Sequence, residues 1–115
     1  MNRREKVDSK YVPELITGIV ERLTAAYRPQ KVILFGSYAR GDARADSDID
    51  IFIIKDTKER MIDRCIEVRR LLSDPDRLIG LEIMVFTPDE VSQRLEVGDQ
   101  FVREVLQEGK ILYAS

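Results

Sequence analysis

The sequence contains no histidine and no tryptophan, and its single cysteine is Cys65. Without histidine the chain cannot form a histidine general base, a histidine metal ligand or a Ser-His-Asp triad. One cysteine excludes internal disulfides and cysteine-rich zinc sites. Cys65 is one of a series of apolar residues at helical spacing, so it is most simply a buried apolar residue and not a nucleophile.

Long apolar runs are also absent, and none approaches the roughly 20 residues that span a bilayer. Residues 1–10 (MNRREKVDSK) have no apolar segment behind their charges, which excludes a signal peptide and predicts a flexible start. The net charge of −2 argues against a large nucleic-acid footprint. We therefore expect a cytoplasmic protein that neither enters a membrane nor binds nucleic acid directly.

The length of 115 residues predicts one domain, residues 1–115, and 43% of the residues are apolar, enough for a substantial core. The charged fraction is 35%, which is typical either of a thermophilic source or of a small domain with much surface.

The most informative stretch is VILFGSYARGDARADSDIDIFII, residues 32–54. Val32–Phe35 and Ile49–Ile54 are short, apolar and bounded by turn residues, which predicts two buried strands. Between them lie Gly36 and Ser37, a short helical piece over Ser37–Arg40 and an acidic loop. Because Gly36 has no Cβ, a phosphate can approach its backbone, and Ser37 can offer its hydroxyl.

A pair of carboxylates begins the second predicted strand. Asp48 and Asp50 are two residues apart, so both point to the same face. Two carboxylates aimed at one place repel unless a cation joins them, and oxygen ligands suit Mg²⁺. If Gly36–Ser37 and this pair serve one ligand, the two strands are antiparallel neighbours. The pattern then predicts a site for a nucleoside triphosphate with Mg²⁺.

Two other ligand loops are excluded. Asp46, Asp48 and Asp50 match the opening of an EF-hand, but Ile51 and Thr57 occupy the positions that require glycine and glutamate. No Gly-Lys-Ser/Thr follows a glycine-rich turn, which excludes a Walker phosphate loop.

The flanking segments predict helices and a third strand. Tyr11–Arg28 and residues 57–73 show helical periodicity, Leu81–Phe86 is a short apolar run, and Thr87–Glu90 form a capping box. A helix between strands two and three makes them parallel, so Glu82 is expected beside Asp48 and Asp50. Further on, residues 101–106 predict an amphipathic turn or two, and residues 110–113 an apolar tail. The predicted fold class is α/β, an α-β-α-β-α-β core whose small mixed sheet is covered by helices.

The spacing Gly36-Ser37, ten residues, Asp48-Ile49-Asp50 resembles the Gly-Ser-x10-Asp-x-Asp signature of the polymerase-beta-like nucleotidyltransferase superfamily. The string GSYARGDARADSDIDIFII is similar to that of its minimal (MNT) branch, and the ending EVLQEGKILYAS is also similar. Glu82, five residues before Thr87-Pro88, resembles the third carboxylate of the superfamily, where aspartate is more common.

The resemblance implies a role for each residue. Asp48 and Asp50 would hold Mg²⁺ on the triphosphate of the substrate ATP, and Glu82 would bind a second Mg²⁺ or take the proton of the attacking hydroxyl. Gly36 and Ser37 would grip the β- and γ-phosphates. Arg40 would orient the loop or meet a phosphate, unless it is ordinary surface charge. The implied reaction transfers a nucleoside monophosphate, AMP from ATP, to a hydroxyl.

The acceptor is implied only by the family. Minimal members are typically paired with a separate all-helical HEPN protein, as antitoxins that adenylylate a tyrosine of that toxin. Two alternatives stay open: a module that neutralises its partner by contact alone, and a homo-oligomeric enzyme that modifies a small molecule such as an antibiotic.

Overall fold

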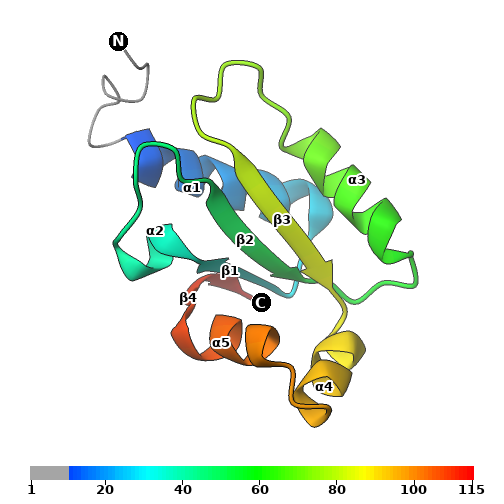
Figure 1. Cartoon of the computed structure of the whole chain (residues 1–115). Coiled ribbons are helices and arrows are strands. Elements are labelled where there is room, and N and C mark those ends of the chain that lie inside the picture. The colour runs from blue at the N-terminus through cyan, green and yellow to red at the C-terminus, as the bar shows by residue number, and fades with distance from the viewer. Residues whose placement is uncertain (1–10) are drawn as a thin grey trace.

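The computed structural model describes residues 11–115, so the predicted flexibility of residues 1–10 lies outside the described residues. These residues form one four-stranded sheet with helices on both faces (Figure 1). The strand order is β3-β2-β1-β4. The elements are α1 (Tyr11–Arg22), the π-helix η2 (Leu23–Tyr27), β1 (Lys31–Phe35), α2 (Ser37–Arg40), β2 (Ile49–Ile54), α3 (Met61–Leu71), β3 (Leu81–Phe86), α4 (Pro88–Glu96), α5 (Gln100–Glu108) and β4 (Lys110–Ala114).

The sheet is mixed, as the sequence predicts. β1 and β2 are antiparallel, and β2 and β3 are parallel because α3 forms the crossover between them. The crossover helix begins at Met61, later than predicted, because the residues before it form a turn in which Thr57 Oγ1 accepts from the Glu59 amide at 3.2 Å.

The predicted apolar tail over residues 110–113 is wrong, because these residues belong to a fourth strand. β4 pairs antiparallel with β1 on the edge opposite to β2. Ile111 is 60% exposed and no residue of β4 is fully buried; Leu112 and Tyr113 are half-buried against the core, so the pattern of the strand is too weak for its sequence to reveal. It is stabilised by backbone pairing to β1, which is a tertiary contact.

Each face of the sheet has its own core. Ile49, Ile51 and Ile53 point to the face covered by α1, η2 and α3, whereas Phe52 points to the face covered by α4 and α5 (Figure 1). All four of these side chains are fully buried. Burial on both faces explains why β2 is a nearly continuous apolar run after Asp50.

The four phenylalanines of the chain form one row on the α4–α5 face. The ring centroids of Phe86 and Phe52 are 5.0 Å apart, those of Phe52 and Phe35 are 6.4 Å apart, and those of Phe35 and Phe101 are 5.5 Å apart. The last two contacts are edge-to-face, an arrangement that aromatic quadrupoles favour. This phenylalanine row runs from the core to a partly exposed ring, that of Phe101 on α5.

A buried ion pair joins α3 to α4. Arg64 is 5% exposed, and its guanidinium donates to both carboxylate oxygens of Glu90, at 2.6 and 3.1 Å. Arg64 also donates to the Val85 carbonyl at 3.0 Å. Glu90 completes the predicted capping box with Thr87, so one carboxylate serves both the cap and the ion pair. None of the helices between residues 11 and 115 is long and apolar enough to cross a membrane.

Candidate active site

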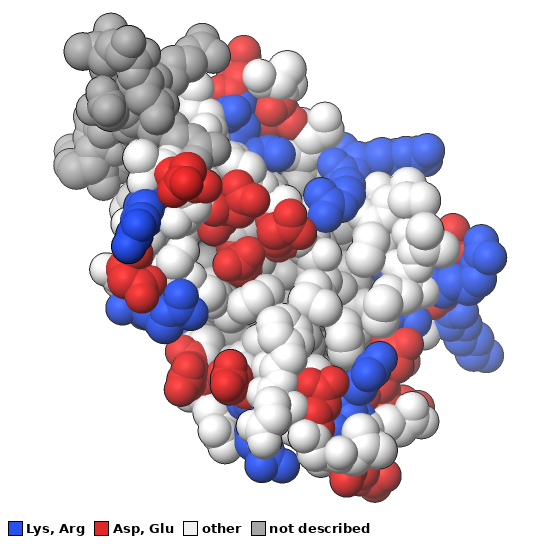
Figure 2. All heavy atoms as spheres, in the orientation of Figure 1, with Lys and Arg blue, Asp and Glu red and all other residues white. Residues whose placement is uncertain are grey.

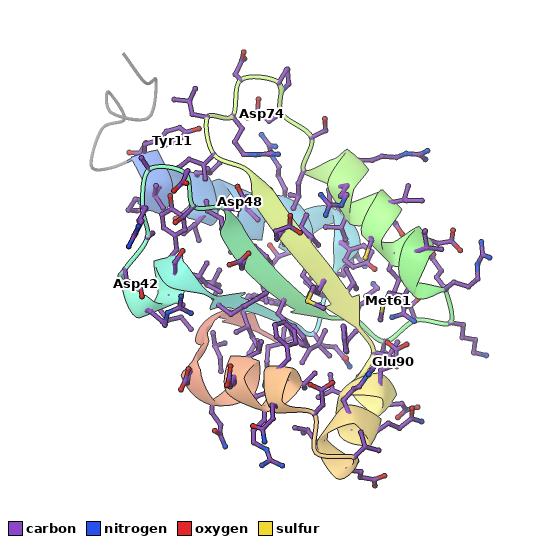
Figure 3. All side chains as sticks on the ribbon, in the orientation of Figure 1. Tyr11, Asp42, Asp48, Met61, Asp74 and Glu90 are labelled. Atoms are coloured by element: carbon purple, nitrogen blue, oxygen red, sulfur yellow. The ribbon has the colours of Figure 1, made fainter. Side chains whose placement is uncertain are left out.

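Three neighbouring strands bring the predicted site residues to one end of the sheet. Phe35, the last residue of β1, lies opposite Asp50 of β2, and Asp50 lies opposite Glu82 of β3. Asp48 precedes β2 by one residue and shares a face with Asp50. Figure 3 shows Asp48 at the N-terminal ends of β2 and β3, with Glu90 at the opposite end of the sheet. Figure 2 shows acidic side chains gathered where these two strands begin.

Each of the two aspartates lies against a glycine. A Cβ on Gly36 would overlap the Oδ2 atom of Asp50, and a Cβ on Gly80 would overlap the Oδ1 atom of Asp48. Gly36 has a φ of 74°, a conformation that other residues rarely adopt, so glycine is required there on two counts. Gly80 is not among the predicted site residues; the one signal in the sequence is a glycine directly before the strand that carries Glu82.

The carboxylates influence one another electrostatically. The pKa of Asp50 is raised above its ordinary value by burial first, then by the negative charges of Asp48 and Glu82, while the positive charge of Arg40 opposes the shift. Ionisation of Asp50 therefore costs free energy, and a cation bound beside its carboxylate would remove this cost.

The donor set fits a hard divalent cation, although its side chains are not yet gathered around one point. Among residues 11–115, no group of three acidic or thiol side chains is close enough to form a metal cluster as it stands. Asp48 and Asp50 rest on different glycines, and Glu82 faces Arg69 of α3 at 3.9 Å. The Glu82 and Arg69 side chains are 62% and 52% exposed, so this ion pair is weak and Glu82 is free to turn. Oxygen-only ligands with mutual repulsion are suited to Mg²⁺.

A pocket of about 350 Å³ adjoins the carboxylates. Its first wall contains four of the predicted residues, Gly36, Ser37, Arg40 and Asp50. Arg40 is also paired with Asp42 across 3.3 Å in an exposed ion pair. The facing wall comes from one side of α5 (Phe101, Glu104, Val105 and Glu108). This second wall is missed by sequence reasoning, which assigns α5 a packing role only.

Four of the six predicted residues line one pocket: Gly36, Ser37, Arg40 and Asp50. Glu82 is the direct neighbour of Asp50 on the adjacent strand. Asp48 does not line the pocket; it sits beyond Asp50, toward Gly80. A polyphosphate in the pocket would have the carboxylates at its side, which is the arrangement that metal-assisted phosphoryl chemistry needs.

Comparison with known proteins defines the class. The family model described as polymerase beta, nucleotidyltransferase matches residues 18–115, and the chain belongs to this family. It is a minimal member and a nucleotidyltransferase enzyme.

Relatives and a solved structure agree with this assignment. A candidate protein adenylyltransferase of Methanocaldococcus jannaschii is 39% identical over 101 residues, covering 85% of this chain and 94% of the relative. A second candidate protein adenylyltransferase of that organism is 29% identical over 80 residues, covering 70% of this chain and 78% of the relative. The crystal structure of a candidate nucleotidyltransferase from Sulfolobus solfataricus superposes with a TM-score of 0.62 at 23% identity, covering 88% of this chain and 78% of that one. This last likeness supports the fold.

Proposed function

We propose that this protein is a Mg²⁺-dependent adenylyltransferase that moves AMP from ATP to a tyrosine hydroxyl of a partner protein. The observation that carries the proposal is the pocket in which Gly36, Ser37 and Arg40 face Asp50, with Glu82 beside Asp50 on the next strand. The names of the two Methanocaldococcus jannaschii relatives, both candidate protein adenylyltransferases, support protein as the acceptor class.

Each residue has a defined part in the reaction. The Ser37 hydroxyl and the Gly36 backbone hold the β- and γ-phosphates, and Arg40 exchanges its exposed pair with Asp42 for a phosphate oxygen. Asp48 and Asp50 would hold Mg²⁺ on the triphosphate. Glu82 would either hold a second Mg²⁺ or accept the proton of the attacking hydroxyl. When bound, Mg²⁺ supplies charge neutralisation on the triphosphate and polarises the α-phosphate.

The transfer then balances without a covalent enzyme intermediate. The acceptor oxygen bonds to the α-phosphorus while the bond from the α-phosphorus to its bridging oxygen breaks, and pyrophosphate leaves with that electron pair. The hydroxyl proton passes to the Glu82 carboxylate or, where Glu82 holds the second Mg²⁺, to water. Positioning and electrostatic stabilisation supply the catalysis, which is consistent with a chain that has no histidine.

The acceptor enters from the side of β3. This strand is one edge of the sheet, and the Glu82 side chain is 62% exposed there, so a hydroxyl on a large partner can reach it. We propose a separate all-helical HEPN-type toxin as that partner, with this chain acting as its antitoxin. This is the arrangement typical of the minimal branch that the sequence resembles.

The test is label transfer to the protein that co-purifies with this chain. With Mg²⁺ present, ATP labelled at the α-phosphate should label the partner, whereas ATP labelled at the γ-phosphate should not. The double variant Asp48→Asn/Asp50→Asn should abolish the label. The matched control Asp76→Asn/Glu96→Gln removes the same charge from two exposed residues that do not line the pocket, and this variant should retain the label.

Each outcome discriminates between functions. Persistent label in the double variant would show that the carboxylates are wrongly assigned. Tight binding of the partner without label would favour neutralisation by contact. Label on an antibiotic-type hydroxyl instead of the partner would favour a small-molecule enzyme.

A further inference from the structure

The α5 wall of the pocket has a chemistry of its own. Four α5 residues at positions i, i+3, i+4 and i+7 share one side of the helix: Phe101, Glu104, Val105 and Glu108. Phe101 stands out because it is 40% exposed although it is a large aromatic side chain at a pocket. Its ring is held in place by the edge-to-face contact with Phe35, whose centroid lies 5.5 Å away.

The two walls differ in the groups that they offer. The first wall presents the Ser37 hydroxyl and the Arg40 guanidinium, which can donate hydrogen bonds to an anion. It also carries the Asp50 carboxylate, which favours an anion only through a cation bound between them. The α5 side presents the carboxylates of Glu104 and Glu108, which accept hydrogen bonds and repel an anion. A ligand that is anionic at one end and rich in donors at the other therefore has a single favourable orientation.

A nucleoside triphosphate has this polarity. Its phosphates are the anionic end, and the donors of its nucleoside are the ribose hydroxyls and the exocyclic amine of adenine. Bases stack on aromatic side chains, which contributes roughly 1–3 kcal/mol for each base. The pocket volume of about 350 Å³ falls within the range of small-molecule sites.

We propose that the α5 wall is the nucleoside subsite of this enzyme. The Phe101 ring packs against the base, and the Glu104 and Glu108 carboxylates accept hydrogen bonds from the nucleoside donors. The proposal rests on the proposed function, since it requires the triphosphate to occupy the Gly36–Ser37 side. It adds residues that no signature of the sequence indicates, on a helix that carries none of the predicted site residues.

The experiment compares ATP with inorganic tripolyphosphate by calorimetry in the presence of Mg²⁺. In the unmodified protein ATP should bind about tenfold more tightly than tripolyphosphate, and Phe101→Ala should remove most of this preference while leaving the affinity for tripolyphosphate unchanged. Glu104→Gln and Glu108→Gln should reduce the same ratio by a smaller factor, about two- to fivefold each. Matched controls are Ile62→Ala, another exposed apolar residue of a helix, and Glu96→Gln.

Analogues separate the two kinds of donor. If the carboxylates bind the ribose hydroxyls, Glu104→Gln should not change the affinity for dideoxyadenosine triphosphate. If they bind the exocyclic amine, Glu104→Gln should not change the affinity for purine riboside triphosphate. Either result supports the subsite and identifies its contact.

The opposing outcomes are also distinct. Equal binding of ATP and tripolyphosphate, or an unchanged ratio in Phe101→Ala and Glu104→Gln together, overturns the nucleoside subsite and leaves the proposed function in place. Absence of binding for both ligands to the unmodified protein overturns the proposed function and the subsite with it. Should Phe101→Ala lower the melting temperature below the assay range, Phe101→Leu keeps the apolar bulk without the ring and carries the same expectation.

Discussion

Replacement of Gly80 by alanine should reduce catalysis with little effect on folding. The Cβ of alanine would overlap Asp48 Oδ1 and lie 3.0 Å from Asp48 Cγ, so the carboxylate must turn away. The atoms that meet the new methyl group belong to the end of a side chain, which can rotate. The backbone contact at this position, from the Ile49 amide to the Gly80 carbonyl at 2.9 Å, is unaffected by a side chain.

The magnitude follows from the role of Asp48 as a proposed metal ligand. Changes that reorient a ligand without removing it typically cost about 10–100-fold in metal affinity or activity. We expect a loss of that size in the rate of AMP transfer, equivalent to about 1.4–2.7 kcal/mol of transition-state stabilisation. Stability should change by less than about 1 kcal/mol, because alanine also lowers the entropy of the unfolded chain.

The assay is the initial rate of label transfer at several Mg²⁺ concentrations, together with a thermal melt. A displaced Asp48 should raise the Mg²⁺ concentration needed for half-maximal rate. Gly18→Ala is the matched control, because the position is inside α1 and, among residues 11–115, no atom outside the local helix backbone lies within 4 Å of the new methyl group. It should retain full activity and gain about 0.5–1 kcal/mol of stability. Full activity of Gly80→Ala across the Mg²⁺ series would refute the placement of Asp48 as a ligand.

Three further predictions follow from charges in the structure. Asp50→Asn should abolish AMP transfer yet raise the melting temperature of the metal-free protein at neutral pH. The folded-state pKa of Asp50 is raised, so the charged form of this side chain destabilises the fold above that pKa. A lowered melting temperature would contradict this reasoning. Glu90→Ala should cost about 3 kcal/mol in a denaturant titration, since it leaves the Arg64 charge buried. The pKa of Glu90 is lowered by its hydrogen bond with Arg64. The difference in unfolding free energy between the unmodified protein and Glu90→Ala should therefore have its full value above pH 4.5 and shrink as the pH falls through the folded-state pKa. A difference that persists in acid would argue against the ion pair. Mg²⁺ with ATP at about a hundredfold excess over the Kd should stabilise the protein by about 2.7 kcal/mol, and no thermal shift at millimolar concentrations would count against a nucleotide site.

The sequence predicts the elements whose signals are local. Ile49–Ile54, Leu81–Phe86 and the short helix Ser37–Arg40 have the predicted bounds, because apolar runs and turn residues mark where each begins and ends. The parallel pairing of β2 and β3 follows from the crossover helix, and it places Glu82 directly beside Asp50. The features that depend on spacing within these elements are therefore predictable.

The remaining features depend on which elements meet in space. β4 is too exposed for its pattern to distinguish it from a tail, and it forms because β1 offers a free edge. Phe101 and Glu104 have the spacing of any amphipathic helix, so only the three-dimensional structure shows that they line a pocket together with residues of α2. Gly80 is an ordinary turn residue in the sequence until Asp48 is seen resting on it.

The pairing of β4 with β1 has a consequence for synthesis on the ribosome. β1 leads directly into Gly36 and Ser37, yet its outer partner comprises residues 110–114, and the Ser115 amide donates to the carbonyl of Gln30 at 2.9 Å. The Gly36–Ser37 turn is thus translated early but gains its full support only when about eighty further residues have emerged. Nascent chains halted before residue 110 should expose one side of β1 to other unpaired strands, and release of the last strand from the exit tunnel should coincide with the onset of ATP binding.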